Sequence, residues 1–250
     1  MGGYGFVGTG AITAAVVEGL GGGEIHLSPR GREVGRVLAD RFPGVRVCAT
    51  NQEVLDRADV VVLAVRPPVA PDVLPGLEFR PDHVVVSAIA GLEIARLRDW
   101  TGPVAAIVRS IPLPGAARGR SLTALYPDHP VARDLFERVG GVVVPEEERT
   151  LDAFSTVTGT FAAYLEYLTT ITRWLADQGV AAGTASAYLR HIHGTLGESL
   201  PAAESLTALS AEFTTPGGLN ERFATTLRAA GVPDTVRRTL DELLAGLRDR

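Results

Sequence analysis

Two glycines near the start of the chain, Gly8 and Gly10, have a spacing that suits phosphate binding. An apolar run reaches Gly8, and an apolar run with helical period begins at Ile12, so the pattern predicts a strand, a tight turn and a helix. Because glycine lacks a Cβ atom, a pyrophosphate can approach this backbone closely, and the following helix offers unpaired N–H groups at its positive end. The third glycine of the dinucleotide fingerprint is replaced by Thr13, which must push the helix outward or bond back to the helix backbone. An ordinary strand–helix turn is therefore the alternative.

The residues about twenty positions after Gly8 indicate which dinucleotide this turn would hold. Residues 24–28 read as a short strand ending at Ser28, where an NAD-binding fold carries a carboxylate for the ribose 2′-hydroxyl. Here Ser28 is followed by Arg30 and Arg32. A guanidinium pairs with a 2′-phosphate that a carboxylate would repel, so the sequence favours NADP(H) over NAD(H). Alternatively, both arginines are simply solvated at a helix start.

The elements needed to position these residues alternate between strands and helices as far as residue 147. After the first strand, strands are expected over residues 24–28, 45–47, 59–65, 83–87, 104–109, 121–126 and 142–144. The run 59–65 is almost continuously apolar, which is typical of a parallel strand covered on both faces. The sequence therefore predicts an α/β fold, with a Rossmann-type doubly wound sheet in a dinucleotide-binding domain at 1–147.

From residue 148 to residue 250 the apolar spacing is helical, and no strand-like run occurs between Leu151 and Arg248. We expect an all-helical substrate and dimerisation domain there, because so few residues bury little core alone and would gain by pairing with a second copy.

Composition excludes several classes of function. The net charge is -5 and no basic stripe is present, so nucleic-acid binding is not expected. No apolar run is long enough to span a membrane, and no basic segment precedes the first apolar stretch as in a signal peptide. The single cysteine, Cys48, fits a reducing cytoplasm, and the scattered histidines predict no metal site. The chain contains no lysine, which argues against a lysine-dependent dehydrogenase mechanism.

Several further motifs, taken in order, resemble those of pyrroline-5-carboxylate reductases, which reduce a cyclic imine to proline. They are Gly5-Phe-Val-Gly-Thr-Gly10, Asn51, Val62-Leu-Ala-Val-Arg-Pro67, Ser87-Ala-Ile-Ala-Gly91, Val108-Arg-Ser-Ile-Pro112, Leu122-Thr-Ala-Leu-Tyr126 and Thr214-Thr-Pro-Gly-Gly218. The resemblance covers nearly the whole chain. It implies an interlocked homodimer, or a ring of dimers, in which each active site takes residues from both subunits.

The resemblance also implies which residues bind the cofactor. The first turn would hold the pyrophosphate, Ser28 and Arg30 the 2′-phosphate, Asn51 and the turn 64–67 the adenosine half, and the segment 88–90 the nicotinamide ribose. The full cofactor set is Phe6, Val7, Gly8, Thr9, Gly10, Ala11, Ile12, Ser28, Arg30, Asn51, Ala64, Val65, Arg66, Pro67, Ala88, Ile89 and Ala90. Asn51 also reads as the cap of the helix that follows it.

The substrate loop implied by the resemblance is centred on Pro216-Gly217-Gly218. Such a turn leaves backbone N–H groups free to bind an anion such as a substrate carboxylate, and a helix beginning near Asn220 would add its positive end. The substrate-binding set is Phe213, Thr214, Thr215, Gly217, Gly218, Leu219 and Asn220. Of these, Thr215 and Asn220 are the candidate catalytic residues that would hold the imine nitrogen. A plain interhelical loop is the alternative.

The chain departs from the family pattern at four places near the expected site. Asn220 stands where the family has a threonine, Leu113 and Ala11 replace asparagines, and Phe161-Ala162 replaces Gly-Pro. These changes keep two alternatives open: an NADPH-dependent reductase of another substrate, and an NADPH-binding regulatory protein without turnover. Imine reduction itself needs mainly proximity between the nicotinamide and the imine, so no catalytic His–Asp pair is required. Tyr164 is a candidate acid, or else a buried helix aromatic.

Overall fold

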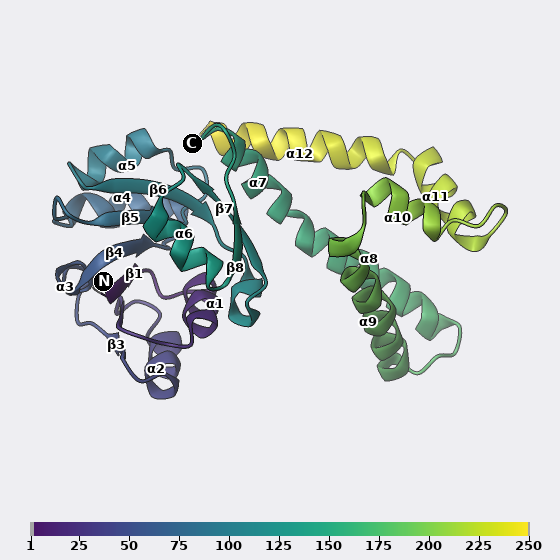
Figure 1. The fold of residues 1–250 in the computed structure, drawn as a ribbon. Helices are drawn as coiled ribbons and strands as arrows, with labels where there is room; N and C mark the ends of the chain where they lie inside the picture. Colours follow the sequence, from purple (N-terminus) through teal and green to yellow (C-terminus); the bar gives the residue numbers. More distant parts are fainter. Residues whose placement is uncertain (1–2, 250) are drawn as a thin grey trace. The chain divides into compact units, whose positions relative to one another are not determined.

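The computed structural model describes residues 3–249, and the strands within them form one sheet in the order β3-β2-β1-β4-β5-β6-β7-β8 (Figure 1). The strands are β1 Gly3–Val7, β2 Ile25–Leu27, β3 Val45–Val47, β4 Ala58–Leu63, β5 Val84–Ser87, β6 Ala106–Ile111, β7 Ser121–Tyr126 and β8 Gly140–Val143. Neighbouring strands are parallel except that β6 and β7 are antiparallel. The predicted doubly wound sheet is therefore confirmed, with strand ends shifted by a residue or two.

Side chains alternate between the two faces of the sheet, so each strand contributes to two cores. On one face, alternate residues such as Phe6 and Val62 pack with buried residues of α1, α2 and α6. On the other, their neighbours Val7 and Leu63 pack with α3, the short helical segments near α4, and α5. These helices are α1 Ala11–Leu20, α2 Arg32–Arg41, α3 Asn51–Arg57, α4 Ala70–Val73, α5 Ile94–Thr101 and α6 Pro130–Glu137; the 3-10 helices are η1 Pro67–Val69, η2 Leu74–Gly76 and η3 Pro114–Arg118.

The start of α3 differs from the prediction by one residue. Thr50, and not Asn51, is the N-cap, because the Thr50 side chain accepts a hydrogen bond from the Glu53 amide at 3.0 Å. Glu53 in turn accepts from the Ala49 amide at 2.7 Å. These two bonds fix the cap at Thr50 and leave Asn51 as the first helical residue.

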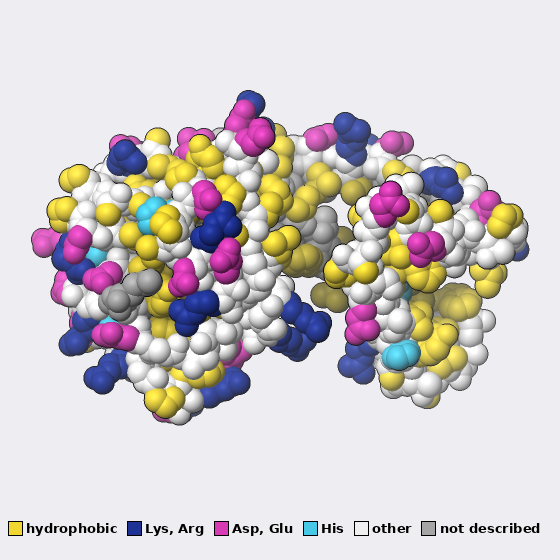
Figure 2. Space-filling view, viewed as in Figure 1, with side chains coloured by type: hydrophobic (Ala, Val, Ile, Leu, Met, Phe, Trp, Pro, Cys, Tyr) yellow, Lys and Arg dark blue, Asp and Glu magenta, His cyan; other side chains and the backbone are white. Residues whose placement is uncertain are grey.

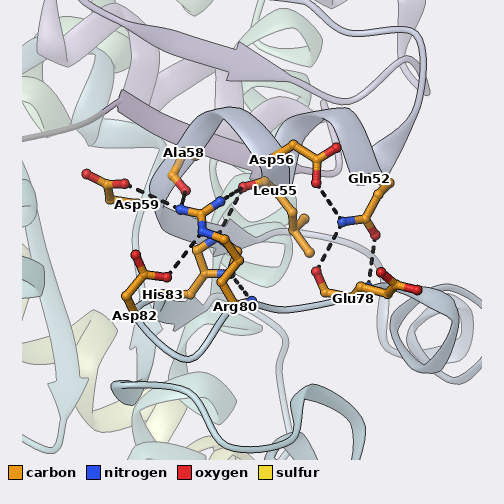
Figure 3. Close-up of polar contacts among 9 residues, drawn as sticks. All are labelled: Gln52, Leu55, Asp56, Ala58, Asp59, Glu78, Arg80, Asp82 and His83. Carbon is orange, nitrogen blue, oxygen red and sulfur yellow. Dashed lines mark hydrogen bonds and ion pairs between the residues drawn. The ribbon is translucent and has the colours of Figure 1, made fainter.

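A polar cluster pins the segment before β5 to the end of α3 (Figure 3). The Arg80 guanidinium donates to the Leu55 carbonyl at 2.7 Å, and the Arg80 amide donates to Nδ1 of His83 at 2.9 Å. His83 Nε2 lies 3.0 Å from the same Leu55 carbonyl, and burial lowers the pKa of His83 below its usual value. Gln52 exchanges two hydrogen bonds with the backbone of Glu78, at 2.9 and 3.0 Å. The cluster lies at the amino ends of β4 and β5, so it supports the fold and not the carboxyl edge where ligands bind.

The chain divides into two compact units, one ending at Thr156 and including the residues from Leu244 onward, the other comprising Val157–Leu243. The predicted domain boundary, between residues 147 and 148, falls before α7 and so within the first unit. The remaining helices are α7 Thr150–Thr158, α8 Thr160–Asp177, α9 Ala182–Ser199, η4 Leu200–Ala202, α10 Leu206–Glu212, α11 Leu219–Ala229 and α12 Val232–Arg248. Within residues 3–249, no helix has the length and hydropathy to cross a membrane.

Candidate active site

The turn between β1 and α1 needs its two glycines for different reasons. Gly8 has a φ of +106°, and a Cβ atom there would lie 2.5 Å from the Ala64 carbonyl oxygen, so the protein's own packing excludes a side chain. A Cβ atom on Gly10 would meet no atom within 4 Å. Gly10 is also the N-cap of α1, and no side chain caps this helix. The amides of the first turn of α1 therefore border open space, as a phosphate site requires.

Thr13 occupies the position of the missing third glycine without disrupting the turn. Its hydroxyl donates to the Gly8 carbonyl at 2.6 Å, and the side chain is buried. The sequence predicted, as one of two possibilities, a bond from this hydroxyl to the helix backbone, whereas the acceptor is the Gly8 carbonyl in the turn before the helix. The bond joins the first turn of α1 to the residue just after the preceding strand.

Ser28, predicted to hold a 2′-phosphate, ties the end of β2 to the turn between β1 and α1. Its hydroxyl accepts from the Gly8 amide at 2.9 Å, and its carbonyl accepts from the Thr9 hydroxyl at 2.9 Å. Only 1% of Ser28 is exposed. These bonds give Ser28 a structural role in the turn, and its contact with a 2′-phosphate stays a prediction.

Arg30 and Arg32 border the same turn, and their surroundings differ from those of other arginines nearby. Both are exposed, and within the described part of the chain neither forms an ion pair. Arg36, one turn further along α2, is instead engaged by Glu33 and Asp40 at 2.8 and 2.9 Å. Two guanidinium groups that lack an ion pair, beside an open glycine turn, suit the binding of a 2′-phosphate.

The other residues predicted to bind the cofactor lie in loops along the carboxyl edge of the sheet. Because β1, β4 and β5 are adjacent and parallel, the loops that follow them are neighbours. The Ala64 amide donates to the Val7 carbonyl and the Ala88 amide to the Leu63 carbonyl, both at 2.8 Å, which joins the three loops. Ile89 is buried in the core, whereas the next residue, Ala90, is exposed. Asn51 follows β3 and is the first residue of α3.

A buried ion network next to these loops has no counterpart in the sequence predictions. Arg109 in β6 is only 4% exposed, and its guanidinium donates to Glu148 at 3.0 Å and to Asp152 at 2.7 Å. Glu148 also accepts from the Ile94 amide at 2.8 Å. An arginine inside an apolar strand was the signal, because a buried charge requires a partner. The sequence does not indicate which of its carboxylates pair with Arg109.

The loop of the second unit that we expected to bind substrate runs from α10 to α11, and the predicted helix start is confirmed because α11 begins at Leu219. Two of its amides are not free, contrary to the prediction: Gly217 donates to the Glu221 carboxylate at 2.6 Å, and Gly218 donates to the Thr215 carbonyl at 2.8 Å. Glu221 lies in the first turn of α11 and can therefore reach back to the turn before it. Sequence reasoning missed Glu221, although its spacing from Gly218 was a signal.

Two further polar side chains of this loop also bond to backbone nearby. The Asn220 side-chain amide donates to the Phe213 carbonyl at 2.9 Å, and the Thr214 hydroxyl donates to the Ser210 carbonyl at 2.7 Å. Phe213 and Leu219 are 50% and 84% exposed, so apolar surface borders the loop.

Tyr164 is not a buried helix aromatic, since 48% of it is exposed. Its hydroxyl lies 3.1 Å from Nδ1 of His193, and the ring of Tyr167 also packs edge-on against that histidine. The hydroxyl therefore has a hydrogen-bonding partner, and Tyr164 stays a candidate proton donor.

Residues 3–249 contain no cluster of three or more His, Cys, Asp or Glu suited to a metal ion.

Comparison with known proteins adds to this geometry. A family model described as "NADP oxidoreductase coenzyme F420-dependent" matches residues 3–91. A pyrroline-5-carboxylate reductase of Synechocystis is 32% identical over 70% of this chain and 68% of its own. The chain belongs to the pyrroline-5-carboxylate reductase family. Pyrroline-5-carboxylate reductase 2 of Bacillus subtilis is 26% identical over 95% of this chain and 91% of its own, so the likeness is not confined to the dinucleotide-binding part.

The fold agrees with this membership. The pyrroline-5-carboxylate reductase of Streptococcus pyogenes superposes over 100% of this chain and 99% of its own, with a TM-score of 0.85 at 22% identity. The family and the fold class predicted from the sequence are thus confirmed, and the chain is an oxidoreductase as predicted.

Proposed function

We propose that the protein uses NADPH to reduce a cyclic imine, pyrroline-5-carboxylate to proline or a closely related imine. Family membership supports the reaction. The observation that supports cofactor binding most directly is the open, uncapped start of α1 at Gly10. This opening lies beside the loops that follow β4 and β5, where a dinucleotide binds in folds of this type.

NADP(H) fits the residues along this edge. The first-turn amides of α1 would bind the pyrophosphate, and Arg30 with Arg32 would bind the 2′-phosphate. Ser28 holds the turn in place through Gly8 and Thr9. When bound, the nicotinamide supplies the hydride. The backbone of residues 88–90 would support the nicotinamide ribose, and Ile89 anchors that segment in the core.

The loop from Phe213 to Asn220 would hold the imine. A protonated imine is already electrophilic, so these residues need chiefly to orient it and to favour its charge. Glu221 contributes a carboxylate beside the loop, which stabilises a cation nearby. The Asn220 side-chain oxygen and the Thr215 hydroxyl are the groups suited to the imine nitrogen. Because Glu221 also occupies the Gly217 amide, a substrate carboxylate must compete with it there.

We also propose that the protein is a homodimer, and that it acts in the cytoplasm as its single cysteine suggests. Many large apolar side chains of the second unit are exposed, and Figure 2 shows hydrophobic side chains on its visible face. They include Phe161, Leu165, Trp174, Tyr188, Leu206, Leu219 and Phe223. An apolar surface of this kind is typical of a subunit interface. Sedimentation at micromolar concentration tests the dimer, and a stable monomer would contradict it.

The test of the reaction is NADPH oxidation, followed by absorbance, with three imines: pyrroline-5-carboxylate, its six-membered homologue and carboxylate-free pyrroline. We expect turnover with pyrroline-5-carboxylate. Turnover only with another imine would make the departures at Asn220 and Phe161 changes of specificity. NADPH binding without turnover of any imine would favour a regulatory protein. Gly10→Asp is the matched control, because it places a carboxylate at the phosphate site without a clash within the protein.

A further inference from the structure

The loop after β5, residues 88–93, carries the segment proposed to support the nicotinamide ribose, and both of its ends are fixed. At its start, the Ala88 amide donates to the Leu63 carbonyl at 2.8 Å, and Ile89 is buried in the core. At its end, the Ile94 amide donates to Glu148 at 2.8 Å. The middle of the loop forms a turn at Ala90 and Gly91.

The last turn of α12, which belongs to the same unit, covers Gly91 directly. A Cβ atom on Gly91 would lie 2.7 Å from Cδ1 and 3.1 Å from the carbonyl oxygen of Leu247. Gly91 also has a φ of +71°, in the region that favours glycine. Leu247 is therefore packed against backbone, and no side chain separates α12 from the loop.

The neighbouring residue, Arg248, connects the same turn of α12 to the buried ion network. Arg248 donates to the Arg149 carbonyl at 3.4 Å and lies 3.9 Å from the second carboxylate oxygen of Asp152. Asp152 and Glu148 in turn hold Arg109. Two arginines thus face two carboxylates, and one of those carboxylates anchors the end of the loop.

We infer that the last turn of α12 is a positioning element for the cofactor loop, with Leu247 holding Gly91 in place and Arg248 fixing the turn to α7. The inference rests on the proposed function, since it takes residues 88–90 to lie against the nicotinamide ribose. A loop ordered before binding loses less conformational entropy when NADPH binds, and it keeps the nicotinamide oriented for hydride transfer. Leu247 thus acts through Gly91 and is a positioning residue.

Leu247→Ala, with the volume-conserving Leu247→Met as its control, tests the inference. In Leu247→Ala we expect the NADPH dissociation constant to rise about fivefold to tenfold and kcat to fall by a similar factor, with the KM for the imine within about twofold. Leu247→Met should have a wild-type NADPH dissociation constant and kcat. Arg248→Gln should change the NADPH dissociation constant and kcat in the same direction but by less, since Arg248 is exposed. Arg237, an exposed arginine in the same helix, is the control, and Arg237→Gln should change neither value.

Direct fluorescence titration of NADPH keeps this test separate from that of the reaction. If the wild-type protein binds NADPH but reduces no imine, the proposed reaction fails and the dissociation constants still decide the inference. A lower melting temperature in Leu247→Ala with unchanged NADPH affinity and unchanged kcat would show that Leu247 is only structural and would overturn the inference. Absence of NADPH binding in the wild-type protein would overturn both.

Discussion

Gly8 and Gly10 lie two residues apart in one turn, yet the structure predicts opposite outcomes when each is given a side chain. Gly8→Ala should destabilise the fold, because the new methyl group would lie 2.5 Å from the Ala64 carbonyl oxygen at a φ of +106°. Gly10→Asp should fold normally, because a Cβ atom there meets no atom within 4 Å and aspartate is a favourable N-cap. It should nevertheless weaken NADPH binding strongly.

The expected magnitudes follow from these contacts. For Gly8→Ala, a positive φ costs about 1–2 kcal/mol and overpacking about 1–3 kcal/mol, so the loss of stability should be about 2–5 kcal/mol. For Gly10→Asp, a carboxylate about 4 Å from a phosphate is repelled by about 4 kcal/mol at an effective dielectric constant of 20. Partial screening by solvent reduces this value, and we expect NADPH affinity to fall at least about hundredfold.

Urea unfolding measures the first effect, and fluorescence titration with NADPH measures the second. The same two assays are applied to both variants, so that each serves as the control for the other. Wild-type NADPH affinity in Gly10→Asp would refute the assignment of this turn as the phosphate site. Wild-type stability in Gly8→Ala would refute the close approach to Ala64.

Three further predictions concern cofactor choice, substrate choice and pH. Arg30→Ala should lower NADPH affinity about tenfold to thirtyfold, since a hydrogen bond to a charged group contributes about 1.5–2 kcal/mol, and it should leave NADH affinity unchanged. Arg36→Ala is the control, because Arg36 is already paired with Glu33 and Asp40. Equal losses of NADPH affinity in the two variants would contradict the assignment of Arg30 to the 2′-phosphate. Glu221→Ala should lower the KM for pyrroline-5-carboxylate about fivefold, because it frees the Gly217 amide and removes a charge that repels the substrate carboxylate. Initial rates with carboxylate-free pyrroline should give an unchanged or higher KM, and unchanged KM values for both substrates would show that Glu221 only caps its helix. Burial lowers the pKa of His83 and His26 in the folded chain. As the pH falls below about 6.5, these histidines are therefore protonated in the unfolded chain before they are in the folded chain, and the free energy of unfolding should decline by at most about 1.4 kcal/mol per pH unit for each histidine. Equal stability to urea at pH 7.5 and pH 5.5 would contradict this prediction.

The sequence by itself determined the fold class and the edge of the sheet where the cofactor would bind. Strand and helix periods are local properties of the chain, so residues 59–65 and 83–87 could be recognised as buried strands without knowing their neighbours. Once the strands are parallel, their carboxyl ends must meet at one edge, which brings the loops at Gly8, Ala64 and Ala88 together. Each of these inferences needed only the order of residues and the geometry of a strand.

Only the tertiary structure decided what individual polar groups do. Ser28 was predicted to bind a phosphate, and the structure shows that its hydroxyl accepts from the Gly8 amide, because the end of β2 packs against the first turn. Arg109 could be recognised as a charge in need of a partner, yet its carboxylates lie about forty residues away along the chain. The contact between Gly91 and Leu247 joins residues still further apart. Such contacts depend on how distant elements pack, and no local pattern of residues carries that information.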